Sequence, residues 1–166
     1  MTDMIIIDGL SFALPLFIMA IGGIYSEKSG ITNLALEGFQ GFGALTGSIA
    51  AVSLMRIFGA SSMIPHYAAF IFAVIGGGIF ALLHALLCIK FKADQVISGV
   101  VMNILALAMT SFLTKSINES FFGASANKFV LGASMRVTIP YVSDIPVLGA
   151  VFNEIYPCEI LIVIAA

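Results

Sequence analysis

Charged residues are scarce along this chain of 166 residues. Only 10% are Asp, Glu, Lys or Arg, whereas a soluble domain carries about 25%. Hydrophobic residues make up 60%, and the mean hydropathy is +1.12. This balance excludes an ordinary soluble globular protein and predicts an integral membrane protein. The net charge of −2 indicates that the chain has no nucleic-acid partner.

Cysteine and tryptophan are also rare. The only two cysteines are Cys88 and Cys158, so the chain has no disulfide framework. Tryptophan is absent, and tyrosine and phenylalanine must therefore form any aromatic belt at the membrane interfaces. No basic residue precedes Met4, so the first apolar stretch lacks the charged start of a cleaved signal peptide. We interpret it as a membrane span.

Four apolar stretches are long enough to cross the bilayer, which takes about 20 helical residues. A fifth begins at residue 159 and is still short where the sequence stops at Ala166. We therefore expect an all-α, polytopic transmembrane helix bundle that forms a single domain over residues 1–166, as the amino-terminal part of a longer chain. The expected spans cover residues 4–24, 34–57, 67–89 and 95–114, and a loop covers 115–157.

A short polar stretch separates the first two spans. It contains the pair Ser29-Gly30, which interrupts helices, and Asn33 and Glu37 follow close to the start of the next apolar run. A carboxylate inside a membrane helix has to face protein or water, because its exposure to hydrocarbon costs about 2.5 kcal/mol or more. We therefore expect a broken helix between Ser29 and Asn33, with the rest of the chain packed around it.

Small residues recur every four positions in the second and third spans. Such residues let helix backbones approach closely within a bilayer. Chance is the alternative explanation in a chain rich in alanine and glycine, and the strict register favours a packing face. The expected packing residues are Gly43 and Gly47 in the second span and Ala73, Gly77 and Ala81 in the third.

The fourth span carries a polar stripe. Gln95, Gly99, Asn103, Ala106 and Thr110 recur at intervals of three or four residues, which places them on one helical face. An amide near mid-span, such as that of Asn103, needs a hydrogen-bond partner. Two interpretations stay open: the stripe bonds to a neighbouring helix, or it lines a polar pathway.

Neither a catalytic nor a metal-binding pattern is present. The chain has no Walker A loop, no dinucleotide-binding turn, no HExxH and no nucleophile elbow. No spacing of His, Cys and carboxylate residues suits a metal ion. We expect a membrane protein that is not an enzyme, most plausibly a transporter or channel subunit.

Two stretches resemble the permease subunit of ATP-binding-cassette importers of the branched-chain amino acid, ribose and nucleoside permease superfamily. The first extends from Pro15 to Gly38 and includes Glu-Lys-Ser-Gly followed by Leu-Glu-Gly, a form similar to the simple-sugar and nucleoside branch. The second covers residues 93–103, followed by Leu-Ala-Leu at 105–107 and by Thr110. With the intervening span, the resemblance covers about the first two-thirds of the chain.

The resemblance implies ATP-driven import of a nucleoside or simple sugar by alternating access in the plasma membrane. It implies a second permease subunit, a cytoplasmic ATPase that binds the ATP, and an external solute-binding protein; the chain itself holds no cofactor. Such permeases contact their ATPase through a cytoplasmic coupling helix, often with a Glu-Ala-Ala-like run and a following glycine, and no such stretch is found before Ala166. A channel or passive carrier without an ATPase, and a membrane scaffold, remain alternatives.

Four residues are candidates for the transport pathway or its gate in this mechanism. Each also has a structural explanation, which is helix capping for the first and bonding between helices for the others. The candidates are Asn33, Glu37, Ser98 and Asn103.

Basic residues predict the orientation of the spans. The short loops after the first and third spans carry Lys28, Lys90 and Lys92. Lysine at this density favours the cytoplasmic side of the membrane. The loop over 115–157 is then external.

We predict that an impermeant thiol reagent applied to intact cells modifies Cys158 and spares Cys88. Cys88 lies beside the cytoplasmic lysines and Cys158 at the outer start of the fifth span, so a hydrocarbon core of about 30 Å separates them. Mass spectrometry of the labelled protein is the measurement. Labelling of Cys88 alone would invert the orientation. A Cys88–Cys158 disulfide, which needs α-carbons within about 7 Å, would remove one of the four spans.

Overall fold

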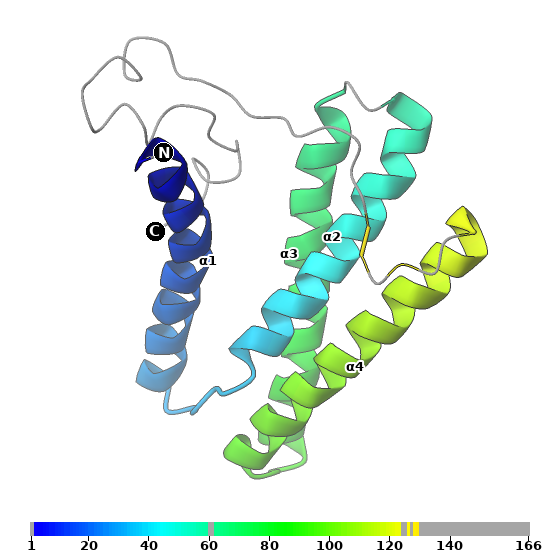
Figure 1. The fold of residues 1–166 in the computed structure, drawn as a ribbon. Helices are drawn as coiled ribbons and strands as arrows, with labels where there is room; N and C mark the ends of the chain where they lie inside the picture. The colour runs from blue at the N-terminus through cyan, green and yellow to red at the C-terminus, as the bar shows by residue number, and fades with distance from the viewer. Residues whose placement is uncertain (1, 60–61, 124–125, 127, 130–166) are drawn as a thin grey trace. The chain divides into compact units, whose positions relative to one another are not determined.

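The computed structural model describes residues 2–59, 62–123, 126 and 128–129. The regular structure of these residues is helical, with no strand among them, and the predicted all-α fold is confirmed (Figure 1). A π-helical segment continues α3 directly, and the two form one long rod. The elements are α1 (Thr2–Lys28), α2 (Leu36–Phe58), α3 (Ile64–Ala85), η1 (Leu86–Lys90) and α4 (Gln95–Phe122).

The chain divides into two compact units between Tyr25 and Ser26, and each is described by itself. Most of α1 belongs to one unit, and it contains the expected span over residues 4–24. The other unit holds α2, α3 with η1, and α4. Within the described residues, three helices are long and apolar enough to cross a membrane, as expected for a polytopic bundle: Leu36–Phe58, Ile64–Lys90 and Gln95–Phe121.

The break between the first two helices covers residues 29–35, and the predicted interruption is confirmed. The backbone turns at Gly30, whose φ of 82° lies in the left-handed region that glycine adopts without strain. The Ser26 hydroxyl donates to the carbonyl of Ile31 at 2.9 Å, which closes the turn. The chain then runs without regular structure to Leu36, where α2 begins.

The end of α4 differs from the prediction. The helix continues through residues 115–122, so the prediction that a loop begins at residue 115 is wrong there. Lys115 and Glu119 end the apolar run without ending the helix, because lysine and glutamate are good helix formers and both side chains are exposed. Gly123, in the left-handed conformation, ends it, and its N–H donates to the carbonyl of Asn118. Residues 130–157, the expected span at 159 and Cys158 lie outside the described residues.

Small residues bring the backbones of α2 and α3 together. A Cβ atom at Gly43 would lie 2.8 Å from the carbonyl oxygen of Ala73, and one at Gly47 would lie 2.7 Å from that of Ala69. A Cβ at Gly77 would lie 3.1 Å from the carbonyl oxygen of Phe39. Ala81, the last expected packing residue, is half-buried. Backbone contacts this close require glycine on both helices of the interface.

One hydroxyl adds a polar contact to the same interface. Thr46 Oγ1 lies 3.0 Å from the carbonyl oxygen of Phe72 on α3, to which it can donate, and 2.9 Å from that of Gly43 on its own helix. The Thr46 side chain also occupies the space in front of Gly76, where no side chain would fit. The two helices therefore meet as a matched surface of glycine, alanine and threonine.

A small apolar core joins the three helices beside the break. Phe80 of α3 stacks on Phe42 at 4.6 Å between ring centroids and meets Phe39 edge-on at 6.4 Å. Ala35, Met102 and Ala106 complete the core, and all three are buried. Large apolar side chains elsewhere on the helices are exposed, as expected for surfaces that face lipid.

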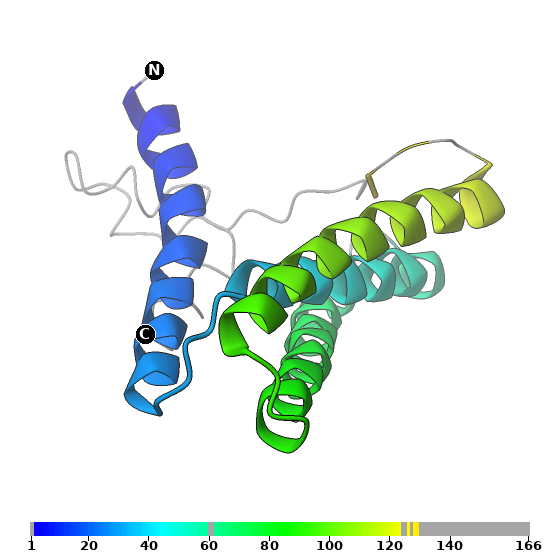
Figure 2. The same ribbon diagram turned by 90° about the horizontal axis from the view of Figure 1, so that it is seen from below.

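α2 also packs against α4, less extensively than against α3, and α3 meets α4 only locally, at the Phe80 core and at His84, within the described residues. In Figure 1 α4 starts near the beginning of α2, and Figure 2 shows the two helices side by side from below. α2 is therefore the central helix of its unit.

We predict that Gly43→Val destabilises the α2–α3 pair. A side chain there meets the backbone of α3, and overpacking of this kind costs about 1–3 kcal/mol. Gly78→Val is the matched control, because no atom lies within 4 Å of a Cβ at Gly78. Thermal unfolding in detergent should show a lower Tm for the first variant only. Equal losses in both variants would mean that helix propensity, and not packing, explains the effect.

Candidate functional site

The polar stripe of α4 contacts the break. Asp94 caps α4 by accepting a hydrogen bond from the N–H of Ile97 at 2.9 Å. Directly after this cap, Gln95 Oε1 accepts from the N–H of Thr32 at 2.9 Å. One turn later, a Cβ at Gly99 would lie 3.0 Å from Cβ of Leu34. The first two members of the stripe therefore hold residues 32–34 against the start of α4.

Asn103, the third member, bonds to the start of α2. Its Oδ1 accepts from the N–H of Gly38 at 2.8 Å, and its Nδ2 donates to the carbonyl of Leu34 at 2.7 Å. A Cβ at Gly38 would lie only 2.9 Å from Oδ1. Glycine at this position therefore permits the close approach of the amide.

A cleft of about 280 Å³ opens next to these bonds, between α2 and α4. Among the described residues that line it, Glu37 contributes the only carboxylate and is exposed. Thr110 Oγ1 donates to the carbonyl of Leu107 at 3.1 Å, so its oxygen remains an acceptor. No atom lies within 4 Å of a Cβ at Gly41, which leaves that wall open. The lining residues are Glu37, Gly38, Gly41, Asn103, Ile104, Ala106, Leu107 and Thr110.

The structure brings two of the four candidate residues together. Glu37 and Asn103 share the cleft. Asn33 lies on the break, three positions before the first residue of α2, and its Oδ1 accepts from the N–H of Ala35 at 3.0 Å. Both residues of this bond precede Leu36, so Asn33 stabilises the non-helical segment just before α2. A gating role for Asn33 stays a prediction.

Ser98, the fourth candidate, lies in a different cluster. Its buried hydroxyl is 3.0 Å from Nδ1 of His84 on α3. Cys88 Sγ lies 3.7 Å from Nε2 of the same ring, and the ring of Phe39 lies 5.8 Å away. His84 and Cys88 are four residues apart, and this spacing places both on one helical face. The sequence could have predicted that these two side chains lie close together. The partner on α4 could not be read from the sequence.

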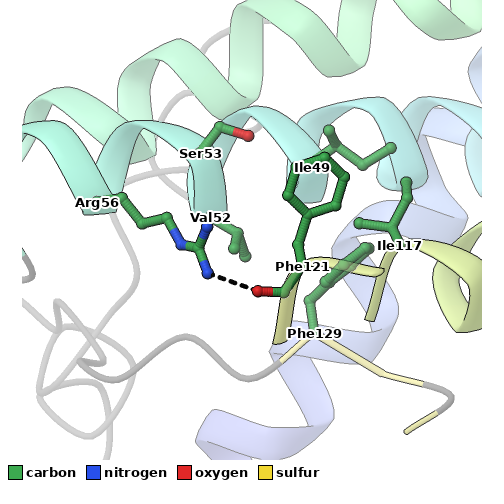
Figure 3. A pocket seen from close by; sticks show the side chains of 7 residues that line it. All are labelled: Ile49, Val52, Ser53, Arg56, Ile117, Phe121 and Phe129. Atoms are coloured by element: carbon green, nitrogen blue, oxygen red, sulfur yellow. Dashed lines mark hydrogen bonds between the residues drawn. The ribbon is translucent and has the colours of Figure 1, made fainter. Parts of the chain in front are cut away.

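A second hollow lies at the opposite end of the α2–α4 pair (Figure 3). Its volume is about 130 Å³, and its walls are mainly apolar. Arg56 Nη2 donates to the carbonyl of Phe121 at 3.0 Å, near the carboxyl end of α4, where a cation is favourable. Nearby, Asn118 Nδ2 lies 2.6 Å from the carbonyl oxygen of Ala126. Sequence analysis did not identify these contacts.

Comparison with known proteins identifies the family. The model of the family described as "branched-chain amino acid transport system / permease component" matches residues 5–165. The chain belongs to this family. The resemblance stated from the sequence motifs is thereby confirmed.

Two relatives cover nearly all of this chain. The guanosine ABC transporter permease protein NupQ of Bacillus subtilis is 35% identical over 158 residues, which are 95% of this chain and 47% of the relative. The nucleoside ABC transporter permease protein NupC of Lactococcus lactis is 32% identical over 150 residues, which are 90% and 45% of the two proteins. This chain therefore spans a little under half the length of these relatives. No solved structure matches it.

A third relative is named for a sugar. The putative glucose ABC transporter permease protein of Haloferax volcanii is 30% identical over 133 residues, which are 80% of this chain and 38% of the relative. Family membership and the three apolar helices agree with the predicted multi-pass protein of the plasma membrane. The family is a permease component and not an ATPase.

We predict that Ser98→Ala destabilises the protein and leaves solute uptake intact. Loss of the hydroxyl leaves a buried His84 nitrogen without its partner, which costs about 1–3 kcal/mol. Ser48→Ala is the control, because Ser48 donates within its own helix, to Leu45. Thermal unfolding and uptake are measured on the same preparations. Reduced uptake at unchanged stability would instead assign Ser98 to the pathway.

Proposed function

We propose that this chain forms part of the membrane pathway of an ATP-driven importer for nucleosides, with simple sugars as the second substrate class. The observation that most directly supports the proposal is the 35% identity, over 95% of the chain, to a permease named for guanosine. The second relative is named for nucleosides, and the third for glucose. All three names describe neutral solutes with several hydroxyl groups.

The energy for transport comes from another subunit. A permease component binds no ATP, and the proposed complex adds a cytoplasmic ATPase, a second permease subunit and an external solute-binding protein. Family membership as a permease component supports this division of roles. ATP binding and hydrolysis would drive alternating access of the helix bundle.

The cleft beside the break is the proposed part of the pathway. Irregular backbone at membrane depth is tolerated where it is buried in protein or lines a cavity. Residues 29–35 adjoin this cleft through Leu34, whose carbonyl accepts a hydrogen bond from Asn103 in the cleft wall. The Glu37 carboxylate and the Thr110 oxygen accept hydrogen bonds, which suits solute hydroxyl and amino groups. Ile104 and Leu107 offer apolar surface for the flat face of a base or sugar.

We predict that Gly41→Leu lowers guanosine uptake at least about tenfold, because the side chain fills the cleft, and pre-organised binding geometry is sensitive to such blocks. Gly78→Leu is the matched control: it too has no atom within 4 Å of its Cβ position, but it lies on α3 outside the cleft. Labelled guanosine uptake is measured in proteoliposomes that hold the complete importer, with and without ATP.

Two results would contradict the proposal. Uptake that is equal in the Gly41 and Gly78 variants would remove the cleft from the pathway. Uptake by the unsubstituted protein that does not depend on ATP would favour a passive carrier over an importer.

A further inference from the structure

The first turn of α2 has no capping side chain of its own. Its N-cap residue is Ala35, and no side-chain hydrogen bond is made from that position. The first N–H groups of any helix lack partners within the helix. One of these groups belongs to Gly38, which is buried, and a buried N–H needs a partner from the protein. Another element has to supply it.

The amide of Asn103 on α4 is that partner. It accepts from the N–H of Gly38, in the first turn, and donates to the carbonyl of Leu34, just before the helix. An N–H can only donate and a carbonyl can only accept, so the two bonds also fix which way the amide points. Between the two bonded residues lies Glu37.

We infer that Asn103 is a positioning residue, which holds the first turn of α2 so that Glu37 faces the cleft. Glu37, and not Asn103, contacts the solute. Both polar atoms of Asn103 are engaged by backbone. Glu37 is exposed at the cleft, and no hydrogen bond or ion pair joins its carboxylate to another described residue. The part of this inference that concerns solute rests on the proposed function.

The structural part is tested without transport. A thiol is placed at the buried N-cap position by Ala35→Cys, with Cys88→Ala and Cys158→Ala removing the native thiols. Asn103→Leu should raise the rate of thiol modification at position 35 at least about fivefold, because a buried thiol reacts only when the turn opens and the uncapped first turn opens more often. Asn103→Ala, which deletes the amide without adding bulk, should act in the same direction and covers the case in which leucine prevents folding.

Thr110→Val is the matched control for this measurement. Thr110 lines the same cleft on the same helix, but its hydroxyl donates to α4 itself and does not contact α2. The modification rate at position 35 should stay within about twofold of the unsubstituted background, because local opening of α2 is unaffected. An unchanged rate in both Asn103 variants would overturn the positioning role.

A double-mutant cycle tests the functional part. Guanosine uptake is measured for Glu37→Gln, for Asn103→Ala and for both together, in proteoliposomes with the complete importer. If Asn103 acts through Glu37, the double variant loses no more of kcat/KM than the more damaging single variant. If the two residues contact the solute independently, their losses multiply, so that two tenfold losses give about a hundredfold loss. Multiplied losses would overturn the inference.

The two possible failures are distinguishable. Normal uptake by both single variants, together with a changed thiol reactivity, would refute the pathway at this cleft and leave Asn103 as a purely structural cap. An unchanged thiol reactivity would refute the cap whatever the uptake shows.

Discussion

The arrangement of this unit depends on the hydrogen bonds that close the start of α2. Gly38 is buried, and a buried backbone N–H without a partner destabilises a fold, so the start of α2 depends on a partner from elsewhere in the protein. Asn103 supplies it from α4, 65 residues further along the chain than Gly38. The glycines at 38 and 99 allow the two backbones to come close enough. The apolar core of Phe80, Met102 and Ala106 forms directly beside this contact.

The two neighbours of α2 pack against it in different ways. α3 meets it along a surface of glycine, alanine and threonine, where an added Cβ would strike backbone oxygen. α4 is joined to it by side-chain-to-backbone bonds near its two ends, through Asn103 and through Arg56. Hollows of about 280 and 130 Å³ lie along the second pair. A further hollow of about 420 Å³ lies against α2 and Phe72 of α3, so volume alone does not separate the two sides. The polar groups of Glu37 and Thr110 in the 280 Å³ cleft are what support the α2–α4 side as the proposed pathway.

The polar stripe on α4 serves more than one purpose. Gln95, Gly99 and Asn103 contact residues 32–38, as expected for bonding between elements, whereas Thr110 lies in the cleft with its hydrogen bond made inside its own helix. Bonding between elements therefore accounts for the first three members, of which Asn103 also lines the cleft, and a pathway role for Thr110 stays a proposal. Ser98, one position away from that face, bonds instead to His84, and a shift of one residue along a helix rotates a side chain by about 100°.

The sequence by itself determined the class, the helical segments, the break after residue 28 and the small-residue face of α2 and α3. These features follow from composition and short-range periodicity, which act within one or two turns of a helix. The end of α4 was misjudged because hydropathy marks where an apolar run stops, whereas Gly123 marks where the helix stops. Only the tertiary structure decided which residues meet across helices: Asn103 with Gly38, Ser98 with His84, and Arg56 with Phe121. Such pairs depend on the rotation and relative height of two packed helices, and the local pattern of either helix leaves both undetermined.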